Sequence, residues 1–264
     1  MGLRRLAGPR RSTPIGSKSA GEGRPRHTTR RSVERMTVNV GEPDGKWMYR
    51  VGGISALVIG IGYIVIFPLF ARVGGPPSGG GEVWLKYLVG KTTVWWAILG
   101  LCVLTDFLYV PVAFSLYLAL ERVNRYAMLA ATAFVGLFVV LDLAVTWTNY
   151  ASLLTLSGLH AAATNDVQRA GYVAAANYAS AVLASRTEVF YSIVDFSLGI
   201  LVIGFVMLKG KGIFSKTTAY LGLAAGIFGI VSISGVFVTI IINAVLTTVW
   251  VWFVGYRLFR LGQK

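Results

Sequence analysis

Long apolar runs constrain this chain more than any other feature of its sequence. Residues 51–70 supply about twenty mostly apolar residues without a charge, and a helix rising 1.5 Å per residue needs that length to cross a ~30 Å hydrocarbon core. Comparable runs span residues 94–120, 128–147 and 189–208, and each of these contains one aspartate and no other charge. The mean hydropathy of +0.65 lies well outside soluble composition. The sequence therefore predicts an all-α, polytopic integral membrane protein.

The last apolar stretch determines the number of predicted spans. Residues 217–259 are almost unbroken apolar sequence, too long for one crossing and long enough for two with a turn. Ser232-Ile-Ser-Gly235 supplies residues typical of a turn. We therefore expect a bundle of six transmembrane helices within residues 47–262. The alternative is one long helix at the end of the chain, and five crossings.

The placement of basic residues predicts the orientation. Under six spans, most Lys and Arg residues share one side with the basic N-terminal tail, and the loops on that side are short. Cytoplasmic loops carry such an excess, so we expect both termini to be cytoplasmic and the protein to lie in a prokaryotic plasma membrane. The residues on that side are Arg122, Arg125, Lys209, Lys211, Lys216, Arg257, Arg260 and Lys264.

The N-terminal tail, residues 1–46, is predicted to be disordered because it is basic, polar and without apolar periodicity. Ten of the 25 Lys and Arg residues lie before Met36, which offers an alternative start that would make the preceding residues an extension. The remaining basic residues mostly flank apolar runs, so the net charge of +14 reflects topology and not a nucleic-acid surface.

The strongest functional signal is a set of acids inside the predicted spans. Asp106, Asp142 and Asp195 lie in three different spans, and Glu188 lies at the rim of the fourth. Intramembrane acids are costly and usually face a bundle interior or a wet cavity. The predicted topology brings the three aspartates to comparable depths on the outer side. They are therefore candidates for one outward-facing pocket.

Polar neighbours extend this predicted site. At helical spacing Tyr191, Ser192 and Asp195 share a face with Glu188, and Thr146 and Asn149 share a face with Asp142. His160 and Arg186 lie in the long outer connection, from which they are candidates to cover the pocket. We expect the carboxyl groups to share protons, because no basic residue lies deep in any span.

The chemistry of such a site is proton exchange or cation binding, without a cofactor. No histidine pair has metal-ligand spacing, and no phosphate-binding glycine loop or nucleophile motif occurs. Neutral aspartates that tie helices together by hydrogen bonds are the structural alternative. Gly222 and Gly226 form a GxxxG motif, which lets helices approach closely within the bundle or across a contact with a second copy or a membrane partner. Trp147 and Trp250 are interpreted as anchors at the membrane interface.

Two segments carry a family resemblance. Residues 115–125, Ser-Leu-Tyr-Leu-Ala-Leu-Glu-Arg-Val-Asn-Arg, and residues 252–262, Trp-Phe-Val-Gly-Tyr-Arg-Leu-Phe-Arg-Leu-Gly, resemble parts of a broad family of uncharacterised prokaryotic six-helix membrane proteins, classed only as a domain of unknown function. The resemblance implies the fold and a membrane location. It implies no activity and no catalytic residues.

Three functions are consistent with the sequence. The first is a small transport, sensing or accessory protein that uses the acidic pocket for protons or a cation, and it requires no enzyme chemistry. The second is an intramembrane enzyme acting on a lipid or isoprenoid, with two carboxyls within ~6 Å as acid and base beside an apolar cleft. The third is a structural subunit of a membrane complex, in which the acids are dispersed among helix contacts.

Overall fold

The computed structural model describes residues 43–210 and 212–264. Residues 1–42 of the predicted basic tail, including Met36, lie outside the described residues, as does Lys211. The first helix, α1, begins at Pro43, a few residues ahead of the predicted start of the transmembrane domain at residue 47.

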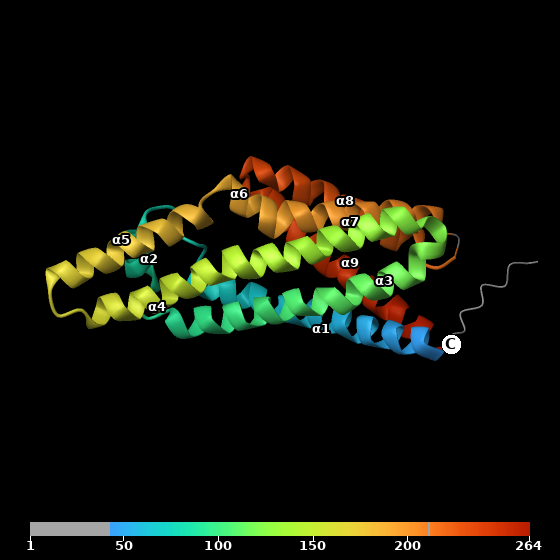
Figure 1. Ribbon diagram of the computed structural model, residues 1–264, viewed down its shortest axis with the longest axis horizontal. Helices are drawn as coiled ribbons and strands as arrows, with labels where there is room; N and C mark the ends of the chain where they lie inside the picture. Colours follow the sequence, from blue (N-terminus) through green and yellow to red (C-terminus); the bar gives the residue numbers. More distant parts are fainter. Residues whose placement is uncertain (1–42, 211) are drawn as a thin grey trace, which may run out of the picture. The chain divides into compact units, whose positions relative to one another are not determined.

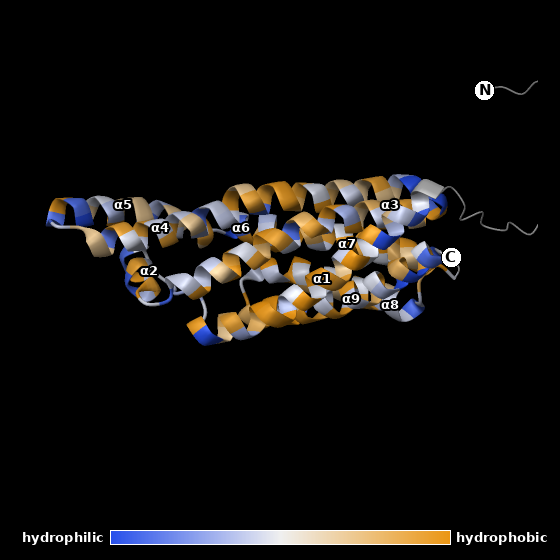
Figure 2. Cartoon of the chain, turned by 90° about the horizontal axis from the view of Figure 1, so that it is seen from below, coloured by the Kyte–Doolittle hydropathy of each residue, from blue (hydrophilic) through white to orange (hydrophobic). Residues whose placement is uncertain are grey.

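Every regular element in the described residues is helical. Within this described part of the chain, five helical segments are long and apolar enough to cross a membrane, and apolar residues dominate their middle portions (Figure 2). The elements are α1 (Pro43–Val73), α2 (Gly81–Leu88), α3 (Thr92–Leu141), the π-helix η1 (Asp142–Trp147), α4 (Thr148–Ala162), α5 (Asp166–Leu183), α6 (Arg186–Val189), the π-helix η2 (Phe190–Val194), α7 (Asp195–Lys209), α8 (Lys216–Val231), the 3-10 helix η3 (Ser232–Ser234) and α9 (Phe237–Gln263).

The longest apolar segment, Thr92–Ala162, is bent back on itself. Asn124 has φ −159° and ψ 94°, so it interrupts the helical backbone of α3 and divides it into two arms. Figure 1 shows the second arm, in yellow-green, returning beside the first and continuing through η1 into α4. The Asn124 side chain accepts a hydrogen bond from the Ala127 N–H and so caps the second arm. This is the helical hairpin that the sequence predicts at residues 121–125.

The turn predicted near the end of the chain is also present. The 3-10 helix η3 closes α8, and Gly235 follows with φ 77°, a left-handed conformation that suits glycine. The last apolar stretch is thus two helices, α8 and α9, as predicted, and the alternative of one long helix there is excluded.

Helix α1 begins beside the end of α9 (Figure 1). Basic side chains connect these two helix ends. Lys46 Nζ donates to the carbonyl of Lys264, and Arg50 Nε donates to that of Gly262. The last carbonyls of a helix lack partners within the helix, so these two cations stabilise the end of α9. Arg257 likewise donates to the carbonyls of Gly212 and Ile213 in the α7–α8 connection.

The opposite end carries the long connection after Asn149. Helix α4 prolongs the second arm of α3, and α5 returns beside it, so the two predicted apolar pieces form one helical hairpin. Helix α2 packs against this hairpin, and Gly81 N–H donates to the Asn177 side chain of α5 at 2.7 Å. A first apolar cluster fills this end: Ile66, Val73, Trp84, Leu85, Leu88, Trp95, Ile98, Cys102, Leu153, Leu154, Ala176 and Ala179.

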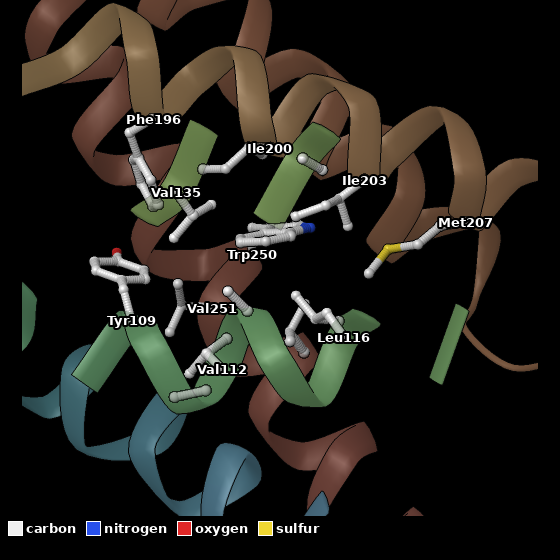
Figure 3. Packing of buried hydrophobic residues seen from close by; sticks show 14 of the residues in the cluster. Tyr109, Val112, Leu116, Val135, Phe196, Ile200, Ile203, Met207, Trp250 and Val251 are labelled. Atoms are coloured by element: carbon white, nitrogen blue, oxygen red, sulfur yellow. The ribbon is translucent and has the colours of Figure 1, made fainter. Parts of the chain in front are cut away.

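A second apolar cluster fills the bundle formed by α1, α3, α7, α8 and α9. Trp250 lies at its centre, between Leu116 of α3 and Ile203 of α7 (Figure 3). Its side chain is buried, so the prediction that Trp250 anchors the membrane interface is wrong. An interface anchor lies near a helix end, whereas α9 continues well past Trp250 to Gln263.

The two glycines of the GxxxG motif make close contacts inside the chain. A Cβ on Gly222 would lie 2.7 Å from the indole nitrogen of Trp250, and one on Gly226 would lie 2.7 Å from Leu201 Cβ. Gly222 therefore lets α8 approach α9, and Gly226 lets it approach α7. Of the two predicted roles of this motif, the structure supports close packing within the bundle.

Candidate functional site: a buried pair of aspartates

Asp106 and Asp142 meet between the two arms of α3. The indole Nε1 of Trp147 donates to Asp106 Oδ2 at 2.7 Å and to Asp142 Oδ2 at 3.1 Å. The two carboxyl oxygens are therefore no further apart than the sum of these distances. Both aspartates are buried, with exposed fractions of 3% and 4%. The predicted meeting of these two acids is present in the structure.

A π-helical turn positions Trp147. In a regular α-helix, residues five apart point in directions about 140° apart, so Trp147 would not reach Asp142. The segment η1 is a π-helix, whose backbone hydrogen bonds join residue i to residue i+5. The wide turn therefore brings Trp147 round to the side of the helix that carries Asp142. The prediction of Trp147 as an interface anchor is wrong, because its N–H points into the bundle.

A second π-helical turn faces the first. The segment η2 precedes α7 and contacts η1, and Glu188 of α6 lies next to it. Thr146 Oγ1 of η1 donates to Glu188 Oε1 at 3.1 Å, which joins the two wide turns. Ser185, the N-cap residue of α6, accepts a hydrogen bond from the Glu188 N–H and fixes the start of this segment. Thr146 and Glu188 thus lie beside the aspartate pair, as the sequence predicts.

The pair lies at the boundary between the two apolar clusters. Along α3, Asp106 falls between Cys102 of the first cluster and Tyr109 of the second. Tyr109 and Tyr63 of α1 join their hydroxyls at 3.1 Å one turn below Asp106. On the other side, Tyr150 packs on Trp147, with ring centroids 5.6 Å apart. The acids therefore occupy a thin polar layer with aromatic rings above and below it.

No basic side chain faces this layer within the described chain. The titratable side chains close enough to interact electrostatically with the two aspartates are Tyr63, Cys102, Tyr109, Tyr150 and Glu188. Two carboxyl groups in contact without a cation cannot both carry charge at low cost in an apolar environment. The arrangement therefore suits a shared proton.

Asp195 does not join the pair. Its neighbour Phe196 packs on Phe138 with ring centroids 4.7 Å apart, so Asp195 lies about one helical turn deeper than Asp142. Both of its carboxyl oxygens are buried, and neither has a hydrogen-bond partner among the described residues. The prediction that three aspartates converge is therefore correct for two of them and wrong for Asp195.

The physical reason lies in η2. A regular 3.6-residue period places Glu188, Tyr191 and Asp195 on one face, but the wide turn at Phe190–Val194 changes the period between them. Glu188 consequently bonds to Thr146 while Asp195 packs deeper in the bundle. Tyr191 is half-buried, and its ring packs edge to face with Phe190.

Three other predicted neighbours lie elsewhere. Asn149 donates its side-chain N–H to the Val145 carbonyl at 2.7 Å, so it satisfies the backbone of the wide turn and not a carboxyl. Helix α4 carries His160 about 18 Å along its axis from Thr148, too far to cover the pair. Arg186 begins α6 as an exposed side chain.

Sequence reasoning missed two aromatic residues of this layer. Trp147 donates to both acids, and the Tyr63 hydroxyl meets that of Tyr109, although Trp147 and Tyr63 each read as an ordinary position in a span. The spacing of Tyr109 three residues after Asp106 was a usable signal, whereas nothing local indicates the wide turn that brings in Trp147. Within the described chain, no group of three or more His, Cys, Asp or Glu residues could hold a metal ion.

Comparison of the chain with family models, with curated proteins and with solved structures finds no match. The resemblance of residues 115–125 and 252–262 to a six-helix membrane family therefore remains a prediction based on those two segments. The function has to be inferred from the geometry of the aspartate pair and from the apolar helices that surround it.

Proposed function

We propose that this protein is a plasma-membrane component for transport or sensing, in which Asp106 and Asp142 reversibly bind protons or a cation. The observation that carries the proposal is the shared hydrogen bond from Trp147 to both carboxyls, deep between apolar helices. Intramembrane acids that meet in this way are expensive to retain unless they are used. Glu188, joined to Thr146 on the outer side, is the entry to the pair.

The proposed topology has six crossings. Each arm of α3 counts as one, because Asn124 separates two apolar helices that run antiparallel. An even number of crossings places both termini on one side, and the basic residues near Arg50, Arg125 and Arg257 make that side the cytoplasm. The pair then lies nearer the outer face, and α2, α4 and α5 extend beyond it.

The alternatives receive less support. An enzyme acting on a lipid needs an apolar cleft beside the acids, whereas the cavity bounded by Tyr109, Phe196 and Trp250 lies in the bundle core and is lined by neither aspartate. A purely structural role predicts dispersed acids, whereas Asp106 and Asp142 are in contact. Gly222 and Gly226, which a partner would have to cover, already face neighbouring helices.

The test is proton flux through liposomes that contain the purified protein. A pH gradient is imposed, and an internal pH-sensitive dye reports flux for the wild type, Asp106→Asn and Asp142→Asn. We expect flux to fall to the level of empty liposomes in both variants with little change in thermal stability, because asparagine keeps the shape but cannot exchange a proton. Glu82→Gln is the control, since Glu82 is an exposed residue that pairs only with Lys86. Lost stability with unchanged flux would instead assign the aspartates to helix tying.

A further inference from the structure

The position of the Trp147 N–H distinguishes a proton from a metal cation as the ligand of the Asp106–Asp142 pair. An indole N–H is a donor only, and here it points at an oxygen of each carboxyl. A metal ion bridging the same two oxygens would have to lie close to the partly positive hydrogen of this group. The indole would repel that ion, whereas it stabilises a carboxylate that accepts its hydrogen.

A second observation indicates that the pair takes a ligand. Asp142 Oδ1 is buried and has no hydrogen-bond partner among the described residues, although Oδ2 of the same carboxyl accepts from Trp147. Buried acceptors are normally satisfied. Asp142 Oδ1 is therefore available to bind a proton, which makes one carboxyl of the pair a donor and leaves the other as an acceptor.

We infer that the ligand of the Asp106–Asp142 pair is a proton and that Trp147 excludes metal cations from it. The inference rests on the proposed function and names its ligand. One O–H bond forms when the pair takes up a proton, and the same bond breaks on release, so no co-reactant is needed. Trp147 is a positioning residue, because it holds the two carboxyls together through its N–H without itself gaining or losing a proton.

The surroundings agree with a proton as the ligand. Tyr63 lies below the pair on α1, Cys102 and Tyr109 flank it on α3, Tyr150 covers it from α4, and Glu188 faces it from α6. Divalent cations take six or more oxygen ligands, or four with nitrogen and sulfur. Phenol hydroxyls and one carboxyl pair fall short of such a set, whereas one proton needs only one donor and one acceptor.

The experiment is infrared spectroscopy of the full-length protein in liposomes. The C=O stretching band of protonated carboxylic acids is followed as pH is varied, and its loss in Asp106→Asn and Asp142→Asn assigns it to the pair. At a pH that retains the band, Na⁺, K⁺, Mg²⁺ and Ca²⁺ are then added separately. For the wild type we expect the band to persist with every cation.

Trp147→Phe keeps the ring and removes the N–H. We expect Ca²⁺ or Na⁺ to suppress the carboxyl band in this variant at concentrations about tenfold or more below those tolerated by the wild type, since a hydrogen bond to a charged group is lost. Trp95→Phe is the matched control. Trp95 also packs on Tyr150, but its N–H donates to Tyr87 and not to an acid.

The outcomes separate the two proposals. Suppression of the wild-type band by a metal cation overturns the inference and leaves the proposed function standing with a metal ligand. Equal resistance of the wild type and Trp147→Phe to cations overturns the role of Trp147. A band that never titrates with pH, or that survives both asparagine variants, overturns the proposed function itself. If Trp147→Phe does not fold, competition in the wild type still decides between proton and metal.

Discussion

At the scale of single residues, glycines that pack directly against a neighbouring helix determine how closely the helices approach. A Cβ on Gly53 of α1 would lie 2.5 Å from the backbone nitrogen of Phe259 in α9 and 2.8 Å from its Cα. Backbone cannot move aside as a flexible side chain does. Gly53 thus sets the spacing between the first and last helices, just as Trp147 sets the spacing between the two aspartates.

Gly53→Ala should destabilise the bundle by about 1–3 kcal/mol, the usual range for an extra methyl group in a well-packed core. Thermal unfolding in detergent measures the effect. Gly100→Ala is the matched control in α3, where a Cβ would meet nothing within 4 Å. Its stability should be unchanged or slightly higher, since alanine favours helix more than glycine does. Equal effects of the two substitutions would contradict close α1–α9 packing.

At the scale of elements, the two π-helical turns decide which side chains meet. A π turn holds one residue more than an α turn, so the helix faces before and after it keep their packing while the residues within it are displaced. In η1 this displacement turns Trp147 toward Asp142. The side chains of Thr148 and Asn149 bond to the carbonyls of Leu143 and Val145 and so stabilise the widened backbone.

Deletion of Ala144, an exposed residue of η1, should convert the π turn into a regular α turn and leave the bundle folded. The carboxyl band of the aspartate pair should persist, because Trp147 then follows Asp142 by four residues and a regular α turn keeps the two side chains on one face. Deletion of Ala130, an exposed residue of the regular part of α3, is the control. This deletion rotates the part of the helix after it by about 100° relative to the part before it. It should clearly lower the temperature at which the protein unfolds. A larger loss of stability for the Ala144 deletion would contradict this account of η1.

At the scale of the whole molecule, charge and topology are linked. The two arms of α3 turn at Asn124, between the basic residues Arg122 and Arg125, and α9 ends near the start of α1 through the bond from Lys46 to Lys264. Most of the basic residues in the described chain therefore lie at one end of the helices, whereas Arg72, Lys86, Lys91, Arg169 and Arg186 lie at the end that carries the hairpin of α4 and α5. This separation is the pattern expected when the first end stays in the cytoplasm.

Labelling of single cysteines in intact cells tests the six-crossing topology. In a Cys102→Ala background, a membrane-impermeant maleimide should label Ser78→Cys and Asn165→Cys from outside. It should label Arg125→Cys and Gln263→Cys only after the cells are opened. All four positions are exposed in the fold, so accessibility reports the side of the membrane. Labelling of Gln263→Cys from outside would indicate an odd number of crossings.

Much of the fold follows from local sequence. Hydropathy is a sum over neighbouring residues, so the spans, the hairpin at Asn124 and the turn at Gly235 were all predictable from it. The burial of Asp106 and Asp142 was predictable for the same reason. The position of Asp195 away from the pair was not predictable, because a regular helical period was assumed across a segment that is a π turn.

The sequence by itself determined that this chain forms apolar helices, roughly where they lie, and that acids lie inside them, because lipid admits little else for such runs. Only the tertiary structure decided which acids meet. The contact of Asp106 and Asp142 depends on how two antiparallel arms are rotated about their axes, and Trp147 reaches both only through the extra residue of η1. Rotation and register arise from packing between distant segments, and no local pattern encodes them.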